Sequence, residues 1–133
     1  MTSHQLLHPR NWKQPKGFAN GIATEGRLVF LAGQVGWNAE QIFESDDFVA
    51  QVGQALANIV ALVAEAGGKP EHIVRLTWFV LSKHEYLSRL RDLGEAYRGA
   101  MGRHFPTMTL VQVGALVEDR AKVEIEATAV LPD

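Results

Sequence analysis

Residues 104–114 read His-Phe-Pro-Thr-Met-Thr-Leu-Val-Gln-Val-Gly, and the rest of the chain is organised around them. The apolar pattern after Pro106 predicts a strand over residues 108–113. Pro106 is compatible with the start of that strand, because proline lacks the N–H that an interior strand position would need. Met108 begins this strand, which gives that position weight in any functional interpretation.

The C-terminal part of the chain alternates cleanly between apolar and polar residues. Residues 121–131 follow a loop through 118–120, and a period of two predicts a strand with one buried face. The apolar parity holds Val123, Ile125, Ala127 and Ala129, and the polar parity holds Lys122, Glu124, Glu126 and Thr128. Glu124 is therefore expected to face away from the core.

Two helices and an apolar strand precede the proline. Apolar residues recur at three and four positions over residues 46–66, which predicts an amphipathic helix that ends at Gly67-Gly68. Residues 73–81 are apolar on both parities and predict a strand buried on both faces. Ser82 and Glu85 have the spacing of a capping box, so a second helix is predicted from there to residue 101.

The N-terminal part is predicted to be an arm followed by a hairpin. Residues 1–16 show no period and predict an irregular arm, and residues 17–133 are predicted to form a single domain. Short apolar runs at 18–24 and 27–32 flank Glu25-Gly26, which predicts a tight hairpin. The order β-β-α-β-α-β-β predicts an α+β fold in which a mixed sheet carries both helices on one face.

The opposite face of this sheet is left bare by that order of elements. Residues 73–81 are apolar on the bare side too, so another subunit is the simplest cover for them. We therefore expect a symmetric oligomer.

Composition narrows the functional classes. The 133-residue chain has no cysteine, a formal net charge of -2 and a pI of about 6.2. Clustered Lys and Arg, a signal-peptide pattern and an apolar run of roughly 20 residues are all missing. The five histidines are scattered, and neither a phosphate-binding loop nor a nucleophile elbow occurs. We expect a cytoplasmic protein with a small-molecule partner, no metal or cofactor, and no nucleic-acid or membrane partner.

Several short motifs, in their order and spacing, resemble the RidA/YjgF family of reactive-intermediate deaminases, which are endoribonuclease L-PSP-like proteins. The resemblance covers nearly the whole chain from Gly17. Its motifs are Ala-Gly-Gln at 32–34, Ala-Leu-Ala-Asn-Ile at 55–59, Gly-Gly at 67–68, Phe-Pro at 105–106, Val-Gln-Val-Gly-Ala-Leu at 111–116 and Val-Glu-Ile-Glu-Ala at 123–127. The resemblance implies a chorismate-mutase-like fold, a homotrimer whose sheets form a central barrel, and clefts between subunits. Active members hydrolyse enamines and imines such as 2-aminoacrylate to keto acids and ammonia.

Three polar positions of the family are apolar in this chain. Active members carry an arginine that grips the substrate carboxylate, and the matching residue here is the uncharged Met108. The family's tyrosine in the first strand and its serine before Gly-Gln match Phe18 and Ala32. Glu124 matches the family carboxylate that handles water or ammonia. The resemblance thus implies that a keto-acid-type substrate is not held in the usual way.

A ligand cleft is predicted to be lined by Phe18, Ala32, Gly33, Trp37, His104, Met108 and Val111, with Glu124 as the catalytic residue. In an enzyme, Glu124 positions water while backbone amides near Gly33 and Val111 stabilise developing negative charge. Simpler interpretations exist: Glu124 as polar barrel lining, Met108 as core packing, His104 as a surface-loop residue and Trp37 as a cover for the core edge.

The leading functional hypothesis is a RidA-like protein that acts on or binds an enamine- or imine-type metabolite and is not the standard 2-aminoacrylate deaminase. Its ligand is expected to be more apolar or aromatic than an amino-acid imine. The alternative is a non-catalytic ligand-binding or regulatory trimer whose cleft kept its shape and lost its chemistry. A ribonuclease or translation inhibitor is disfavoured by the acidic balance of the chain.

Overall fold

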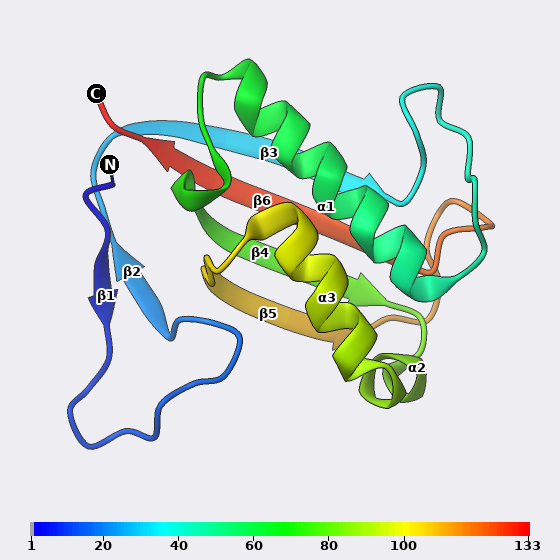
Figure 1. The fold of residues 1–133 in the computed structure, drawn as a ribbon, viewed down its shortest axis with the longest axis horizontal. Coiled ribbons are helices and arrows are strands. Elements are labelled where there is room, and N and C mark those ends of the chain that lie inside the picture. Colours follow the sequence, from blue (N-terminus) through cyan, green and yellow to red (C-terminus); the bar gives the residue numbers. More distant parts are fainter. Residues whose placement is uncertain (1) are drawn as a thin grey trace.

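The computed structural model describes residues 2–133, in which a twisted sheet carries helices on one face (Figure 1). The elements are β1 (Gln5–Leu7), β2 (Gly21–Ala23), β3 (Arg27–Val35), α1 (Phe48–Glu65), the 3-10 turn η1 (Pro70–His72), β4 (Ile73–Val80), α2 (Lys83–Ser88), α3 (Leu90–Met101), β5 (Thr107–Gln112) and β6 (Val123–Leu131). The predicted α+β class is confirmed, with one more strand and one more helix than the sequence pattern indicates.

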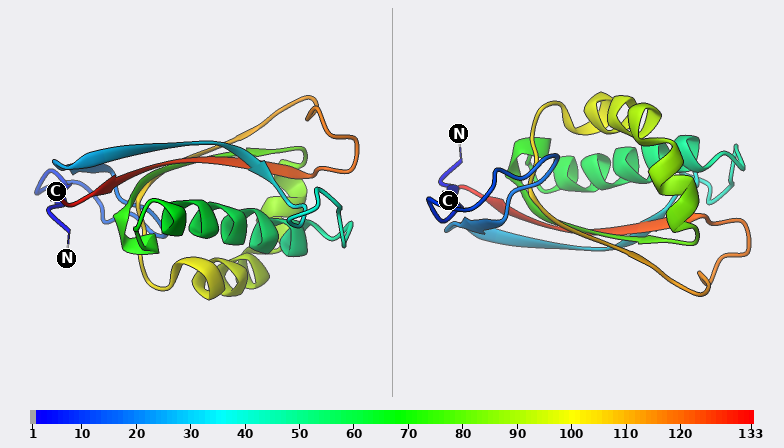
Figure 2. Two further views of the ribbon diagram at one scale, coloured as in Figure 1. Left: turned by 90° about the horizontal axis from the view of Figure 1, so that it is seen from above. Right: turned by 90° about the horizontal axis from the view of Figure 1, so that it is seen from below.

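The main sheet has four strands in the order β3-β6-β4-β5. β6 runs antiparallel to both β3 and β4, and β5 runs parallel to β4. The long connection from β4 through α2 and α3 to β5 is what a parallel pair requires, because a tight turn cannot join parallel strands. Figure 2 shows α1 and α3 on the same side of the sheet. We call the other side, which no helix of residues 2–133 covers, the open face.

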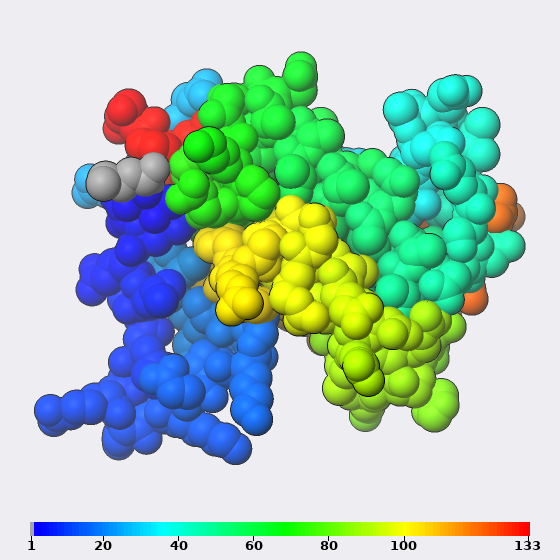
Figure 3. All heavy atoms as spheres, viewed as in Figure 1, coloured from blue at the N-terminus to red at the C-terminus, as the bar shows by residue number. Residues whose placement is uncertain are grey.

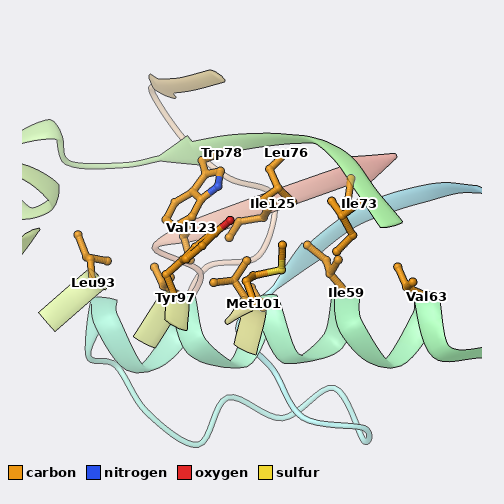
Figure 4. Close-up of a cluster of buried hydrophobic side chains, with 14 of the residues drawn as sticks. Ile59, Val63, Ile73, Leu76, Trp78, Leu93, Tyr97, Met101, Val123 and Ile125 are labelled. Carbon is orange, nitrogen blue, oxygen red and sulfur yellow. The ribbon is translucent and has the colours of Figure 1, made fainter. Parts of the chain in front are cut away.

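The hydrophobic core lies between the sheet and the helices α1 and α3 (Figure 4). The predicted apolar stripe of α1 is buried, and Ile59 and Val63 have no exposed surface. On β6 the apolar parity is buried as predicted, with Ile125 fully enclosed. Figure 4 shows Tyr97 of α3 and Trp78 of β4 reaching into the same cluster.

Helix α1 is the central packing element. It has 18 residues with a mean hydropathy of 1.5, which by length and composition alone would suffice for a membrane span. Seven of its residues are buried, and its apolar stripe joins the main core cluster, which accounts for that hydropathy. At its start, Asp47 Oδ2 accepts a hydrogen bond from the Ala50 N–H at 3.0 Å, as an N-cap residue does.

The hairpin predicted between residues 18–24 and 27–32 is wrong. β2 pairs with β1, and β3 pairs with β6. Gly26 has a φ of 145°, and a Cβ there would overlap the Leu131 carbonyl oxygen, so the chain turns against the end of β6. The arm over residues 1–16 is not wholly irregular either, because it contributes β1. All three residues of β1 are exposed, so no apolar pattern marked this strand.

Two other boundaries differ from the prediction. The second helix is interrupted at Arg89, which separates α2 from α3 and whose Nη1 donates to Asp47 Oδ1 at 2.6 Å. β3 continues past its predicted end to Val35 through a bulge between Leu31 and Gln34. This bulge brings Gly33 into the position described next.

Candidate functional site

Glu124 lies on the open face, where strand register determines its neighbours. It pairs with Val35 on β3 and with Phe79 on β4. A Cβ at Gly33 would overlap the Glu124 carboxylate, so the missing side chain at Gly33 makes room for that carboxylate. Val111 pairs with Phe79 from the other side and is therefore two strands, roughly 10 Å, from Glu124. The structure thus places Gly33 against Glu124 and Val111 farther along the same row.

Ala32 lies within β3 directly before Gly33, and Trp37 lies two residues after the end of β3. Ala32 is exposed in the bulge, and its carbonyl accepts a hydrogen bond from Gln34 Nε2 at 3.2 Å. The Trp37 ring packs on Phe43 with centroids 5.7 Å apart, and its carbonyl accepts from Asn58 Nδ2 at 2.8 Å. This position fits the simpler interpretation of Trp37 as a cover for the core edge, and its contact with a ligand stays a prediction.

Met108 faces the helices. It lies on β5 opposite Leu76 and packs against the main core cluster, half-buried. Because successive side chains of a strand point to opposite faces, Met108 and Val111 lie on opposite sides of β5. Within one chain, Met108 and Glu124 therefore do not face a common cleft.

His104 joins three elements. Its Nε2 lies 2.6 Å from the Ile73 carbonyl oxygen, and since that oxygen only accepts, Nε2–H is the donor. The His104 carbonyl accepts a hydrogen bond from the Tyr97 hydroxyl at 2.6 Å. His104 is therefore a half-buried structural connection between β4, α3 and the start of β5, and less free than a surface-loop histidine.

The N-terminal segment forms a cavity of about 540 Å³ whose lining includes His4, Phe18 and His104. The rings of His4 and His104 lie 6.3 Å apart. Burial, and then the neighbouring His104, lower the pKa of His4, so its imidazole is neutral at neutral pH. Phe18 is 38% exposed and reaches two further cavities, one of which it shares with Met108.

A separate cavity of about 300 Å³, which we call the aromatic cavity, lies between α2, α3, β4, β5 and the N-terminal segment. Its walls include Trp78, Tyr86, Tyr97, Phe105 and Met108, with Lys16 and Arg98 also in the lining. Tyr97 and Phe105 stack with centroids 5.4 Å apart, and Trp78 and Tyr86 meet edge to face at 6.3 Å. Figure 3 shows the N-terminal segment, in blue, next to the body of the molecule that carries α3, in yellow.

Of the residues that line this cavity, sequence reasoning predicted only Met108 as a ligand contact. The helix predicted from the capping box to residue 101 contains both Tyr86 and Tyr97, but that prediction does not indicate a cavity. No local sequence pattern indicated that Lys16 and Arg98 lie together, because 82 positions separate them in the chain and only the tertiary fold brings them to one cavity. No three His, Asp or Glu side chains of residues 2–133 are placed to hold a metal ion.

The open sheet, the helix layer and the Gly33–Glu124 contact define a small α+β protein of the chorismate-mutase-like class. The family model described as Endoribonuclease L-PSP matches residues 13–131. The chain belongs to this family, the RidA/YjgF family.

Individual relatives agree with that assignment. The 2-iminobutanoate/2-iminopropanoate deaminase of Salmonella typhimurium is 33% identical over 105 residues, which cover 79% of this chain and 80% of the relative. Protein DfrA of Myxococcus xanthus is 36% identical over 112 residues, with 79% and 77% covered. The crystal structure of YyfB from Yersinia pestis, a Rid-family protein of unknown function, superposes with a TM-score of 0.85 at 29% identity and covers 96% of this chain and 98% of that one.

Proposed function

We propose that this protein binds or processes an enamine- or imine-type metabolite and is not a standard 2-aminoacrylate deaminase. Imine chemistry is supported by the relatives that are named 2-iminobutanoate/2-iminopropanoate deaminase. One observation supports the proposal that the protein is not a standard 2-aminoacrylate deaminase. At the position of the family's carboxylate-binding arginine, Met108 presents an uncharged side chain that packs on the core.

A second copy of the chain completes the cleft in this proposal. The open face exposes the apolar side chains Leu28, Phe30 and Val111 by 59%, 75% and 42%. Exposed apolar patches favour association, and a homotrimer with facing sheets covers this one. Because Met108 and Glu124 face opposite sides of one sheet, a cleft that contains both is built from two subunits.

The catalytic form of the proposal assigns one task to Glu124. Its carboxylate takes a proton from a water molecule as the water oxygen bonds to the imine carbon, and the proton is passed to the nitrogen. The Glu124 carboxylate then passes the hydroxyl proton of the resulting carbinolamine to the nitrogen, so that the C–N bond breaks, ammonia leaves and a carbonyl compound remains. Gly33 keeps space for the carboxylate, and nearby backbone amides stabilise developing negative charge.

The second candidate is a non-catalytic ligand-binding trimer. The observation in its favour is that Phe18 and Ala32, as well as Met108, are apolar where the family carries polar groups. A Glu124→Gln variant separates the candidates. If Glu124 is the general acid–base group, the substitution should lower the rate of imine hydrolysis by roughly 100-fold or more. An unchanged rate in any activity found would favour a protein that only binds its ligand.

The direct test generates 2-aminoacrylate with a coupled dehydratase and follows keto-acid release. We expect release close to the spontaneous rate, because neutral Met108 does not grip a carboxylate. An arginine-bearing relative serves as the positive control. Release at a rate comparable with that relative would show that the argument from Met108 is wrong.

A further inference from the structure

The aromatic cavity is lined by two aromatic ring pairs, in which Tyr86 and Phe105 are the more exposed members and Trp78 and Tyr97 belong to the core. Its two ring pairs, Tyr97 with Phe105 and Trp78 with Tyr86, differ in orientation, with interplanar angles of 7° and 84°. Aromatic faces and edges favour stacked and edge-to-face contacts with another ring. A volume of about 300 Å³ is at the lower end of small-molecule sites, which favours a ligand with a single ring.

Two exposed cations belong to the same cavity. Arg98 and Lys16 line it, and neither takes part in any of the ion pairs formed by residues 2–133. The Arg98 guanidinium lies over Gly94, where a Cβ would be 3.2 Å from Nη1, so it stays close to the cavity. Guanidinium groups bind carboxylates with two parallel hydrogen bonds. The cavity is therefore suited to a ligand that carries an anionic group.

We infer that the aromatic cavity binds a small aromatic carboxylate, whose ring lies among Trp78, Tyr86, Tyr97 and Phe105 and whose carboxylate is held by Arg98 and Lys16. This inference rests on the proposed function and deepens it by naming the class of ligand that binds beside Met108. The positive charge in this cavity comes from Arg98 and Lys16, and a carboxylate without a ring, such as 2-aminoacrylate, lacks the contacts with the aromatic walls. Burial raises the pKa of the Tyr86 hydroxyl, so this side chain adds no negative charge to the cavity.

The test is isothermal titration calorimetry with three probes. Phenylacetate carries the ring and the charge, phenylacetamide carries the ring without the charge, and propanoate carries the charge without the ring. We expect phenylacetate to bind about tenfold more tightly than either of the other two, because a charge-assisted hydrogen bond and ring burial each contribute about that factor.

Matched variants locate the binding. Arg98→Gln should remove the preference for phenylacetate over phenylacetamide, and Arg91→Gln, an exposed arginine on the same helix outside the cavity lining, should keep it. Tyr86→Ala should weaken both aromatic probes together. Thermal unfolding of each variant checks that it is folded.

Several results would overturn the inference: equal binding of phenylacetate and phenylacetamide, equal binding of propanoate, no binding of phenylacetate at millimolar concentration, or the same loss with Arg91→Gln as with Arg98→Gln. These titrations contain no imine and no turnover, so they fail or succeed separately from the proposed function. Rapid 2-aminoacrylate hydrolysis would refute that function and leave the titration result standing.

Discussion

Gly36 is a buried position where adding one methyl group should cost several kcal/mol of stability by packing alone, since its φ is not positive. It follows β3 and is buried against α1, where a Cβ would lie 2.6 Å from Gln51 Cα and 2.7 Å from Gln51 O. Such contacts are closer than folded proteins tolerate, and they involve helix backbone, so Gly36→Ala must displace α1.

The displacement also affects the hydrogen bonds of the buried Gln51 side chain. Its Nε2 donates to the Ser45 and Arg120 carbonyls at 3.0 Å each, and its Oε1 accepts from the Lys122 N–H at 2.8 Å. Overpacking costs about 1–3 kcal/mol, and each weakened hydrogen bond adds up to about 1 kcal/mol. We expect Gly36→Ala to lower the free energy of unfolding by about 3 kcal/mol, which corresponds to a fall in Tm of about 10 °C.

Gly33→Ala is the matched control. The atoms nearest to its Cβ all belong to the movable Glu124 side chain, so we expect a loss below about 1 kcal/mol in stability and a loss of any activity that depends on Glu124. Thermal unfolding followed by circular dichroism at one fixed protein concentration measures both variants, since self-association makes Tm depend on concentration. A fall of less than about 3 °C for Gly36→Ala, or equal falls for both variants, would refute the reasoning.

Three further variants test the packing and charge of the fold. The hydrogen bond from Arg89, and then that from a backbone N–H, lower the pKa of Asp47 below its ordinary value of 3.8. The charged carboxylate therefore stabilises the fold above pH 3.8, and this contribution is lost as pH falls through the pKa of the folded state. Urea unfolding at pH 7 and pH 3 should show that acid lowers the stability of Asp47→Asn less than that of the unsubstituted protein. Tyr97→Phe removes the hydrogen bond to the His104 carbonyl and should cost about 1 kcal/mol in chemical denaturation, and no measurable change would contradict that role. Phe30→Glu places a charge on the most exposed large apolar residue of the open face, and light scattering should show a smaller assembly than the unsubstituted protein forms; equal masses would exclude the open face from self-association.

Local patterns predicted most of the main sheet and its helices correctly. The alternation around Ile125 and the helical stripe around Ile59 both place the buried side chains as observed, because burial on one face of a regular element imposes its period on the sequence. The same local patterns predicted only part of the candidate site. Alternation placed Glu124 on the face opposite to the core, but the bulge that brings Gly33 against its carboxylate has no periodic signal.

The sequence by itself determined the family, the α+β class and the absence of a charge at Met108, since these depend on residue identity and local period. Only the tertiary structure decided that β2 pairs with β1, that Met108 and Glu124 face opposite sides of the sheet, and that Lys16 and Arg98 share one cavity. These three features depend on contacts between segments that are distant in the chain or on an exposed strand. Such contacts and such a strand leave no local pattern in the sequence.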